Sequence, residues 1–579
     1  MKKFFRQVLV TALGMLLAFA AISALLTGIL LFTVRSSPAK LTKPTVLHIK
    51  LAGNLVEYVH SPRPGDQDFI DLVTLKKAIR DAQEDRHIRG IYLEVGYQLS
   101  AGWSSLAEIR KALAAFKETG KFITAYGQAY TQQTYYLASL ADEIVMHPAG
   151  HFVFNGLSLQ VLFYKGLLDK LEITPQIFRA GPYKSAVEPF ISHTMSPANK
   201  RQYQVMLNTV YDHLIDTIAA TRHVSPRSLR KLSHKWPIMS AEEAHGAQLI
   251  THIAYAEGVE ALLRNKLSLD EDASISYIRF GKYAKINRSH PKSSTPQIAV
   301  LVAAGPLTDD ATVPLRVGSK SFVKNLNSLK QDPDVKAIVI RINSPGGSAL
   351  IADTLWEALM RTRDCKPLVA SMADVAASGG YYLASACHHI VAHAVTLTGS
   401  IGVFGLYFSS HALLKNKLGI TLDGVKTAPS ADLFSGYRAL NTYEAGLIQR
   451  SVDSTYRTFL ERVATGRSRP IEAIAAVAGG RVWPGVLAQA HGLVDQLGGL
   501  EEAIAQAASL AGITDTYTVS YWPKPETWLG ELWDIWSATV LYQMLCRHVS
   551  ALHPYAGILH ELSAMRGIQA RLPHSLEIS

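Results

Sequence analysis

Cysteine is scarce in this chain, and its scarcity excludes two classes of protein. The 579 residues contain three cysteines, Cys365, Cys387 and Cys546, and their spacing matches no metal-binding or redox motif. The chain is therefore neither a disulfide scaffold nor a zinc protein, and we expect no metal and no other cofactor. We interpret Cys387 as a small buried hydrophobic residue.

Charge is also sparse. Charged residues make up 18% of the chain and hydrophobic residues 48%, which is typical of a globular protein with an apolar excess. The formal net charge is +11, but the basic residues are spread along the chain without a finger or zipper motif. Nucleic acid is therefore not an expected partner. Two interpretations of the basic excess remain, a solvated surface and attraction to anionic lipid.

One segment near the start has no charged residue at all. Basic residues lie within positions 1–7, none lies within 8–34, and Arg35 follows. A helix of that length spans the ~30 Å hydrocarbon core of a bilayer, whereas the apolar part of a secretory signal has only about 7–15 residues. We predict an uncleaved transmembrane anchor at 8–34, a short cytoplasmic tail at 1–7 and an exported body, with membrane lipid as a partner.

The body contains one pattern twice, at a nearly constant offset of 246 or 247 positions. The matched segments are Ile88–Ile91 with Val335–Ile338, Tyr135–Ser139 with Tyr381–Ser385, and Ala244–Gly246 with Ala490–Gly492. Such matches indicate a tandem duplication. The predicted domains are a first repeat at 45–280, a basic linker at 281–297, a second repeat at 298–515 and a Trp-rich tail at 516–579.

Each copy alternates short, β-branched apolar runs with stretches of helical periodicity. This pattern predicts an α/β fold whose parallel strands are joined by crossover helices. The tail has no counterpart in the first copy and carries Trp522, Trp528, Trp533 and Trp536. Two interpretations of it stay open: a helix packed on the body, or an interfacial helix resting on a membrane.

The two copies differ where catalytic residues would lie. The second copy has Ala376–Gly380, which includes Ser378, where the first has Tyr130–Thr134. The first copy has Gly181–Ala186, which includes Lys184, where the second has Thr427–Ala431. A candidate nucleophile thus survives in one copy and a candidate base in the other. Each segment also has an ordinary interpretation, tight helix packing for the serine and a solvated surface position for the lysine.

Glycines near the serine favour the catalytic interpretation. The run Asn343–Gly347 directly follows an apolar strand, at the carboxyl end where parallel sheets place their sites. We predict an oxyanion hole formed by the amide of Gly379 together with that of Gly346 or Gly347.

A serine nucleophile needs a base, and histidine is the usual choice. His388, His389 and His393 are near Ser378 in sequence, but a helix of ten residues would carry His388 about 15 Å away. We interpret all three as surface or packing residues. Lys184 has small and apolar neighbours, and burial would lower its pKa toward neutrality.

Four ordered motifs together resemble the long, duplicated form of the signal peptide peptidase A family, over roughly residues 1–515. The motifs are Gly181–Phe190, Asn343–Gly347, Ala376–Tyr382 and Leu397–Gly405. The resemblance implies a crotonase-like or Clp-protease-like fold in each copy. It also implies a homotetramer on the outer face of the bacterial inner membrane, degrading signal peptides after their release.

The resemblance also implies roles for single residues. Ser378 would be the nucleophile, Lys184 the general base, Gly346 or Gly347 an oxyanion donor, and Ser400 a hydroxyl that orients the lysine. Three functions therefore compete. A membrane-anchored serine peptidase with a Ser-Lys dyad leads, ahead of a non-catalytic membrane scaffold and a crotonase-type acyl-CoA enzyme.

Overall fold

The computed structural model describes residues 41–59, 69–286, 295–309, 316–513, 516–524 and 568–572, and the single positions 14, 15, 18 and 21. Within these residues, no helix has the length and apolar character needed to cross a bilayer. The predicted anchor at 8–34 lies outside the described residues apart from the four single positions. Cys546 and three of the tail tryptophans, Trp528, Trp533 and Trp536, also lie outside them.

The first repeat is built on a seven-stranded sheet in the order β10-β1-β3-β4-β5-β9, with β2 added beside β1. All its neighbouring strands are parallel. A separate antiparallel pair joins β6 to β8. The strands are β1 (Thr45–Val56), β2 (Phe69–Asp71), β3 (Ile88–Ser100), β4 (Phe122–Gly127), β5 (Glu143–Met146), β6 (Phe152–Val153), β8 (Ile238–Met239), β9 (His252–Ile253) and β10 (Tyr277–Arg279).

The second repeat has an eight-stranded sheet in the order β20-β18-β16-β14-β11-β22, with β17 and β21 attached beside β16. Its pairs are parallel except β18 with β20. Strand β14 reads VKAIVIRINS and is buried along most of its length, as a central parallel strand must be. The strands are β11 (Gln297–Ala304), β14 (Val335–Ser344), β16 (Leu368–Ala377), β17 (His389–Ala392), β18 (Leu397–Gly399), β20 (Val482–Pro484), β21 (Gln496–Leu497) and β22 (Thr518–Trp522).

Helices follow the strands in the same order in both copies, which confirms the duplication and the α/β class. The first repeat contains α2 (Leu72–Glu84), α3 (Trp103–Glu118), α4 (Gln132–Ala138), α5 (Lys165–Lys170), α6 (Glu188–Ile191), α7 (Pro197–Arg222), α8 (Pro226–Lys235), α9 (Ala241–Gly246), α10 (Ala256–Leu267) and α11 (Phe280–Ile286). The second contains α12 (Ser319–Gln331), α13 (Ala349–Arg363), α14 (Gly379–Ser385), α15 (Thr442–Arg467), α16 (Ile471–Val477), α17 (Gly485–Ala490) and α18 (Leu500–Leu510).

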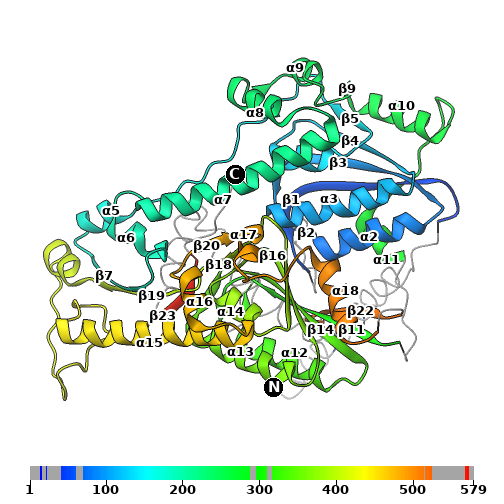
Figure 1. Ribbon diagram of the computed structural model, residues 1–579. Coiled ribbons are helices and arrows are strands. Elements are labelled where there is room, and N and C mark those ends of the chain that lie inside the picture. The colour runs from blue at the N-terminus through cyan, green and yellow to red at the C-terminus, as the bar shows by residue number, and fades with distance from the viewer. Residues whose placement is uncertain are drawn as a thin grey trace, which may run out of the picture.

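The longest helices of the two copies, α7 and α15, begin at side-chain caps. Ser196 accepts a hydrogen bond from the Asn199 amide at the start of α7, and Pro197 occupies the first turn. Asn441 and Glu444 form a capping box at the start of α15. Both helices extend to the left side of the molecule in Figure 1. There they lie beside a projecting region, which we call the arm and which contains Thr174–Ala180 and Val403–Ser409.

Parts of the predicted linker and tail belong to the folded repeats. Helix α11 covers the start of the linker, and β22 lies within the stretch assigned to the tail. β22 pairs with β11, as β10 pairs with β1 in the first copy. The second sheet therefore continues past residue 515, and the short alternation in Thr518–Trp522 was too weak a signal beside the tryptophans to reveal a strand.

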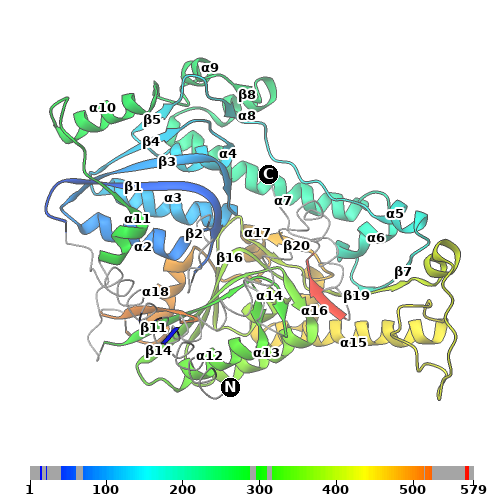
Figure 2. The ribbon, with the colours of Figure 1, turned by 180° about the vertical axis from the view of Figure 1, so that it is seen from behind.

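A third sheet joins the two repeats. Its order is β13-β12-β15-β23-β19-β7. Strand β7 (Thr174–Ala180) comes from the first repeat and pairs antiparallel with β19 (Val403–Ser409) of the second, from Ser409 opposite Thr174 to Val403 opposite Ala180. The remaining strands are β12 (Leu307–Thr308), β13 (Val317–Gly318), β15 (Gly346–Ser348) and β23 (Ile568–Arg571). The β7–β19 ladder forms part of the arm in Figures 1 and 2.

The apolar core also crosses the boundary between the repeats. The core of the first repeat includes Leu397 and Val482 of the second, and the core of the second includes Phe178 and Ala180 of the first. The two copies thus share buried surface at the end where β7 enters. The next residues after β7 carry the candidate lysine.

Candidate active site

Strand β7 delivers the lysine of the first repeat to the serine of the second. The chain leaves β7 at Ala180 and reaches Lys184 after a short turn. There the Nζ atom of Lys184 lies 2.8 Å from the Oγ atom of Ser378, although the two residues are 194 positions apart. This is the separation at which a base can take a proton from a hydroxyl group.

Lys184 is enclosed by hydroxyl and carbonyl oxygens. Its Nζ atom is 3.1 Å from both the Oγ atom and the carbonyl oxygen of Ser400. The side chain is 1% exposed. Burial penalises the charged form and holds the pKa of Lys184 well below its usual value. The amine therefore has a lowered proton affinity and three oxygen partners that fix its direction.

Ser378 occupies a sharp turn between β16 and α14. Its backbone has φ 56° and ψ −115°, a conformation that residues with a side chain rarely adopt. The Ser378 amide donates to the carbonyl of Gly399 at 2.8 Å, and Ser400 also has a positive φ, of 51°. Backbone strain of this kind is held by surrounding structure and is concentrated at functional sites.

The candidate oxyanion glycines lie beside the serine. A Cβ atom added to Gly346 would lie 2.7 Å from the amide nitrogen of Gly379, so the two residues are in direct backbone contact. Gly379 is the first residue of α14, and its N–H therefore has no partner within the helix. Gly347 is the next residue along β15, opposite Leu307. The three glycines thus lie close together, next to Ser378.

A strand from the far end of the chain lies across these glycines. Strand β23 pairs antiparallel with β15, with Ala570 opposite Gly347, and with β19 on its other side. The Leu572 amide donates to the carbonyl of Pro345 at 2.8 Å. Ala570 and Leu572 are buried, and Ser378 beneath them has no exposed surface. An extended peptide segment therefore already fills the groove between β15 and β19, as Figure 2 shows for β23 beside β19.

Two features of the site escaped the sequence analysis. Gly479 and Gly480 form a loop against the lysine turn, in which the Tyr183 amide donates to the Gly479 carbonyl at 2.9 Å. A Cβ atom on Gly480 would come within 2.6–2.8 Å of Lys184, so only glycine fits there. The adjacent glycines were a readable signal. Their proximity to residue 184 was not readable from the sequence.

Gln202 on α7 is the second such feature. Its Nε2 atom donates to the Ser185 hydroxyl at 3.2 Å, and its Oε1 atom accepts from the Val482 amide at 3.3 Å. This side chain ties the residue after Lys184 to the second repeat. No motif marks a single glutamine in a helix as a bridge of this kind.

The three histidines near Ser378 in sequence make their contacts elsewhere. His388 accepts from the Leu368 amide, His389 pairs with Gln496, and the ring of His393 packs on His213. Cys387 is buried, and burial raises the pKa of its thiol to about 12. These residues have packing roles, and the lysine is the group that contacts the serine.

Both repeats are similar to known proteins. Residues 115–270 and 361–514 match the model of "Peptidase family S49", one match in each repeat. The chain is 35% identical to "Protease 4" of Salmonella typhi over 83% of this chain and 78% of the relative. It is 30% identical to "Serine protease SPPA, chloroplastic" of Arabidopsis thaliana over 92% of this chain and 78% of the relative.

A solved structure of a ClpP1 mutant from Listeria monocytogenes is similar at 12% identity, covering 35% of this chain and 94% of that chain. Its TM-score of 0.24 is too low to bear on the fold. The family matches in both repeats and the two long relatives show the family without this structure. They leave the scaffold and acyl-CoA interpretations without support: this chain belongs to peptidase family S49 and is a serine peptidase.

Proposed function

We propose that this protein is a membrane-anchored endopeptidase that cleaves released signal peptides and other short hydrophobic peptides with a Ser378–Lys184 dyad. The observation that carries the proposal is the 2.8 Å separation of Lys184 Nζ and Ser378 Oγ, both buried and each from a different repeat. A nucleophile within hydrogen-bond reach of a base, which is itself oriented by a third group, is the arrangement that activates a serine.

In the first half of the reaction, the neutral amine of Lys184 takes the proton of Ser378 while Oγ attacks the peptide carbonyl carbon. The tetrahedral intermediate carries its negative charge on the former carbonyl oxygen. The amides of Gly379 and Gly347 stabilise that oxygen, because the Gly346 amide already donates to Ser344 Oγ at 3.2 Å. The protonated lysine then gives its proton to the leaving amine, the C–N bond breaks, and an acyl ester remains on Ser378.

Water completes the cycle by the reverse sequence. Lys184 takes a proton from water, the hydroxide attacks the ester, and the lysine returns the proton to Ser378 Oγ as the acid product leaves. Both halves need an amine that is neutral before each attack. Burial lowers the pKa of Lys184 and so supplies the neutral form, while Ser400 keeps the amine aimed at Ser378.

The proposed substrate is an extended, apolar peptide. Strand β23 supports this, because it lies antiparallel to β15 and β19 through backbone pairing that any sequence can make. Backbone pairing suits signal peptides, which have few polar side chains to recognise. The uncharged segment 8–34 would hold the catalytic body on the outer face of the bacterial inner membrane, where such peptides leave the bilayer.

A homotetramer completes the proposal. The arm formed around β7, β19 and the segment after β19 exposes large apolar side chains, among them Leu162, Leu418, Leu422, Val425 and Phe434. Large apolar side chains exposed on one region favour contact with another protein surface. We expect this arm to pack against further copies of the same chain, which would wall off Ser378 from folded proteins.

A fluorophosphonate probe tests the dyad directly. We expect wild-type protein to be labelled on Ser378 and to hydrolyse a synthetic signal peptide. Ser378→Ala should lose labelling and hydrolysis, and Lys184→Ala should lose about 10²–10⁴-fold in both rates, the usual contribution of a general base. His393→Ala is the control and should keep wild-type rates. More than a few percent of wild-type activity in Lys184→Ala would contradict the dyad.

A further inference from the structure

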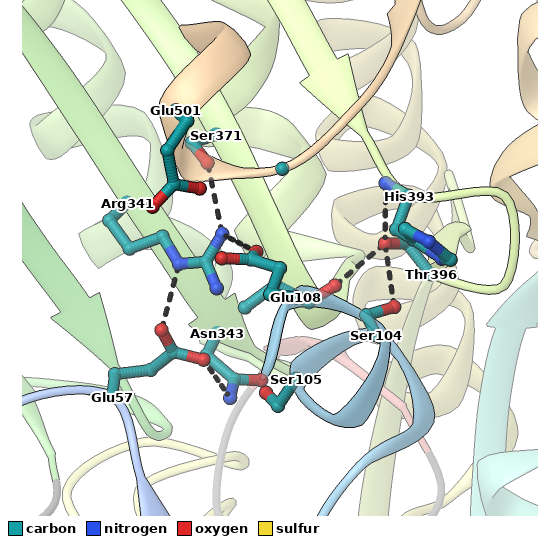
Figure 3. Close-up of polar contacts among 12 residues, drawn as sticks. Glu57, Ser104, Ser105, Glu108, Arg341, Asn343, Ser371, His393, Thr396 and Glu501 are labelled. Atoms are coloured by element: carbon teal, nitrogen blue, oxygen red, sulfur yellow. Dashed lines mark hydrogen bonds and ion pairs between the residues drawn. The ribbon is translucent and has the colours of Figure 1, made fainter. Parts of the chain in front are cut away.

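A cluster of buried charges lies between the repeats, beside the strand that leads to Gly346 and Gly347. Its centre is Arg341 on β14, which is 1% exposed. Glu57 directly follows β1, Glu108 lies on α3, and these two first-repeat carboxylates are 5% and 4% exposed. Figure 3 shows both carboxylates directed at the guanidinium group. The first repeat thus supplies the acidic partners of a buried cation in the second.

The contacts of the cluster are specific. Arg341 donates from Nε to Glu57 Oε2 at 2.8 Å, and its Nη1 atom lies 2.8 Å from Glu108 Oε1. Lys76 pairs with Glu108 and also with Glu501, the latter at 2.7 Å. A buried ion pair is by itself weak evidence of stabilisation, because desolvation offsets much of the Coulomb attraction.

Glu57 has a second contact that reaches the catalytic loops. Its Oε1 atom accepts a hydrogen bond from Nδ2 of Asn343 at 3.1 Å. The other end of that amide, Oδ1, accepts from the backbone N–H of Val375 at 3.2 Å. Asn343 opens the run that leads to Gly346 and Gly347, and Val375 is three residues before Ser378. One side-chain amide therefore bridges β14 and β16 at the register shift between these paired strands, just before the candidate oxyanion glycines and Ser378.

The carboxylate decides which way this amide faces. An ionised carboxylate only accepts hydrogen bonds, so it draws the NH₂ end of Asn343 and leaves the oxygen for the Val375 N–H. If the group at position 57 presented a donor instead, the amide would have to turn round. Its NH₂ group would then face the Val375 N–H, and because both groups are donors they could not form a hydrogen bond. Backbone pairing of β14 with β16 is irregular at this point, so the amide supplies the contact between Asn343 and Val375.

We infer that Glu57 is a positioning residue for the reaction, holding the oxyanion loop in register with Ser378 through Asn343. The inference rests on the Ser378–Lys184 mechanism proposed above. It gives the first repeat two contributions to a site whose nucleophile lies in the second: the base and a residue that positions the oxyanion glycines. Glu57 touches neither substrate nor reacting atoms, so its effect should fall on transition-state stabilisation.

The test compares Glu57→Gln with Glu501→Gln. Both remove one carboxylate from the same cluster, but Glu501 pairs with Lys76 and not with Asn343. We expect Glu57→Gln to lower kcat on a chromogenic hydrophobic peptide by roughly tenfold to a hundredfold with KM within about twofold. Glu501→Gln should keep both constants within about twofold. Equal losses in the two variants would overturn the inference.

Inhibitor affinity separates positioning from a general loss of structure. A peptide aldehyde adds to a catalytic serine and places an oxyanion in the hole, whereas the matching peptide alcohol does not. Glu57→Gln should weaken aldehyde binding by about the same factor as kcat and leave alcohol binding unchanged. An unchanged aldehyde affinity would overturn the inference.

Two further variants keep the test decisive if Glu57→Gln folds poorly. Asn343→Leu removes the amide, leaves the Glu57–Arg341 pair intact, and should show the same split between kcat and KM. Combining Glu57→Gln with Asn343→Asp exchanges amide and carboxylate at constant net charge and should recover most of the lost kcat. Full activity in Asn343→Leu, or no recovery in the combined variant, would count against Glu57. Wild-type hydrolysis by Ser378→Ala would instead refute the dyad itself.

Discussion

At the scale of single residues, Lys184 has the least ordinary environment. A lysine is rarely buried unless a carboxylate pairs with it. Here the three partners of Nζ are uncharged oxygens of Ser378 and Ser400. A buried amine without a neighbouring anion is disfavoured in its charged form, and this is the property that a neutral general base requires.

The proposed role of this lysine as the base predicts the pH dependence of the reaction. Because its pKa lies well below the usual value, the neutral and active form accumulates as pH rises. We expect kcat/KM for a hydrophobic peptide to increase from mildly acid to alkaline pH through a single ionisation and then to level off. The same curve should be found for His393→Ala. A flat profile from about pH 6 to 9, or an inflection that disappears in His393→Ala, would contradict the assignment of the base.

The same group makes stability depend on pH. The pKa of Lys184 is lowered in the folded state, so the unfolded state binds more protons between that pKa and the unfolded value of about 10.4. Across this window the free energy of unfolding should rise with pH, by up to about 1.4 kcal/mol per pH unit for one proton. Lys184→Met should lack this part of the slope. Urea titrations of both proteins at several pH values measure it, and parallel curves would exclude a buried neutral lysine.

At the scale of elements, β23 determines access to the site. It fills the groove between β15 and β19, and Ser378 has no exposed surface beneath it. A substrate that pairs with the same strands has to displace it. A substrate bound in the proposed way would therefore compete with β23 for one set of backbone hydrogen bonds.

Removal of β23 tests this competition. Deletion of 568–579 should lower KM for a hydrophobic peptide several-fold and speed labelling of Ser378, because no intramolecular strand then has to leave. Deletion of 573–579 alone keeps β23 and Leu572 and should behave as wild type. If the longer deletion raises KM or leaves labelling unchanged while the protein stays folded, β23 does not compete with substrate.

At the scale of the whole molecule, the proposed active site is assembled from both repeats and is buried. Lys184, Ser378 and Ser400 are each at most 1% exposed. A folded protein cannot present an extended backbone to such a groove without local unfolding. The arm of exposed apolar side chains around β7 and β19 would close the approach further if copies of the chain pack there.

Substrate choice should therefore depend on conformation. Purified enzyme incubated with a synthetic signal peptide and with a stable folded domain should cleave the peptide at apolar or small residues and leave the domain intact. Unfolding the domain by reduction or mutation should make it a substrate. Cleavage of the folded domain at the rate of the peptide would refute an enclosed site.

Much of this protein was determined by local sequence. Repeated segments at nearly constant offset revealed the duplication, and β-branched runs between helical stretches revealed the parallel sheets. Both signals can be read from the order of residues without knowing which of them meet in space. Ser378 and Lys184 stood out because each copy keeps one candidate group and lacks the other. The glycines at 346, 347 and 379 stood out because close backbone approach requires them.

Tertiary structure alone decided how these parts meet. The pairing of β7 with β19 brings position 184 to position 378, and its register depends on how two whole repeats pack. Other contacts likewise join residues that are far apart in the chain. They are the fit of Gly480 against Lys184, the bridge made by Gln202, the pairing of β23 with β15 and the contact of Glu57 with Asn343. No local propensity encodes such contacts, since each exists only once both cores have formed and shared their buried surface.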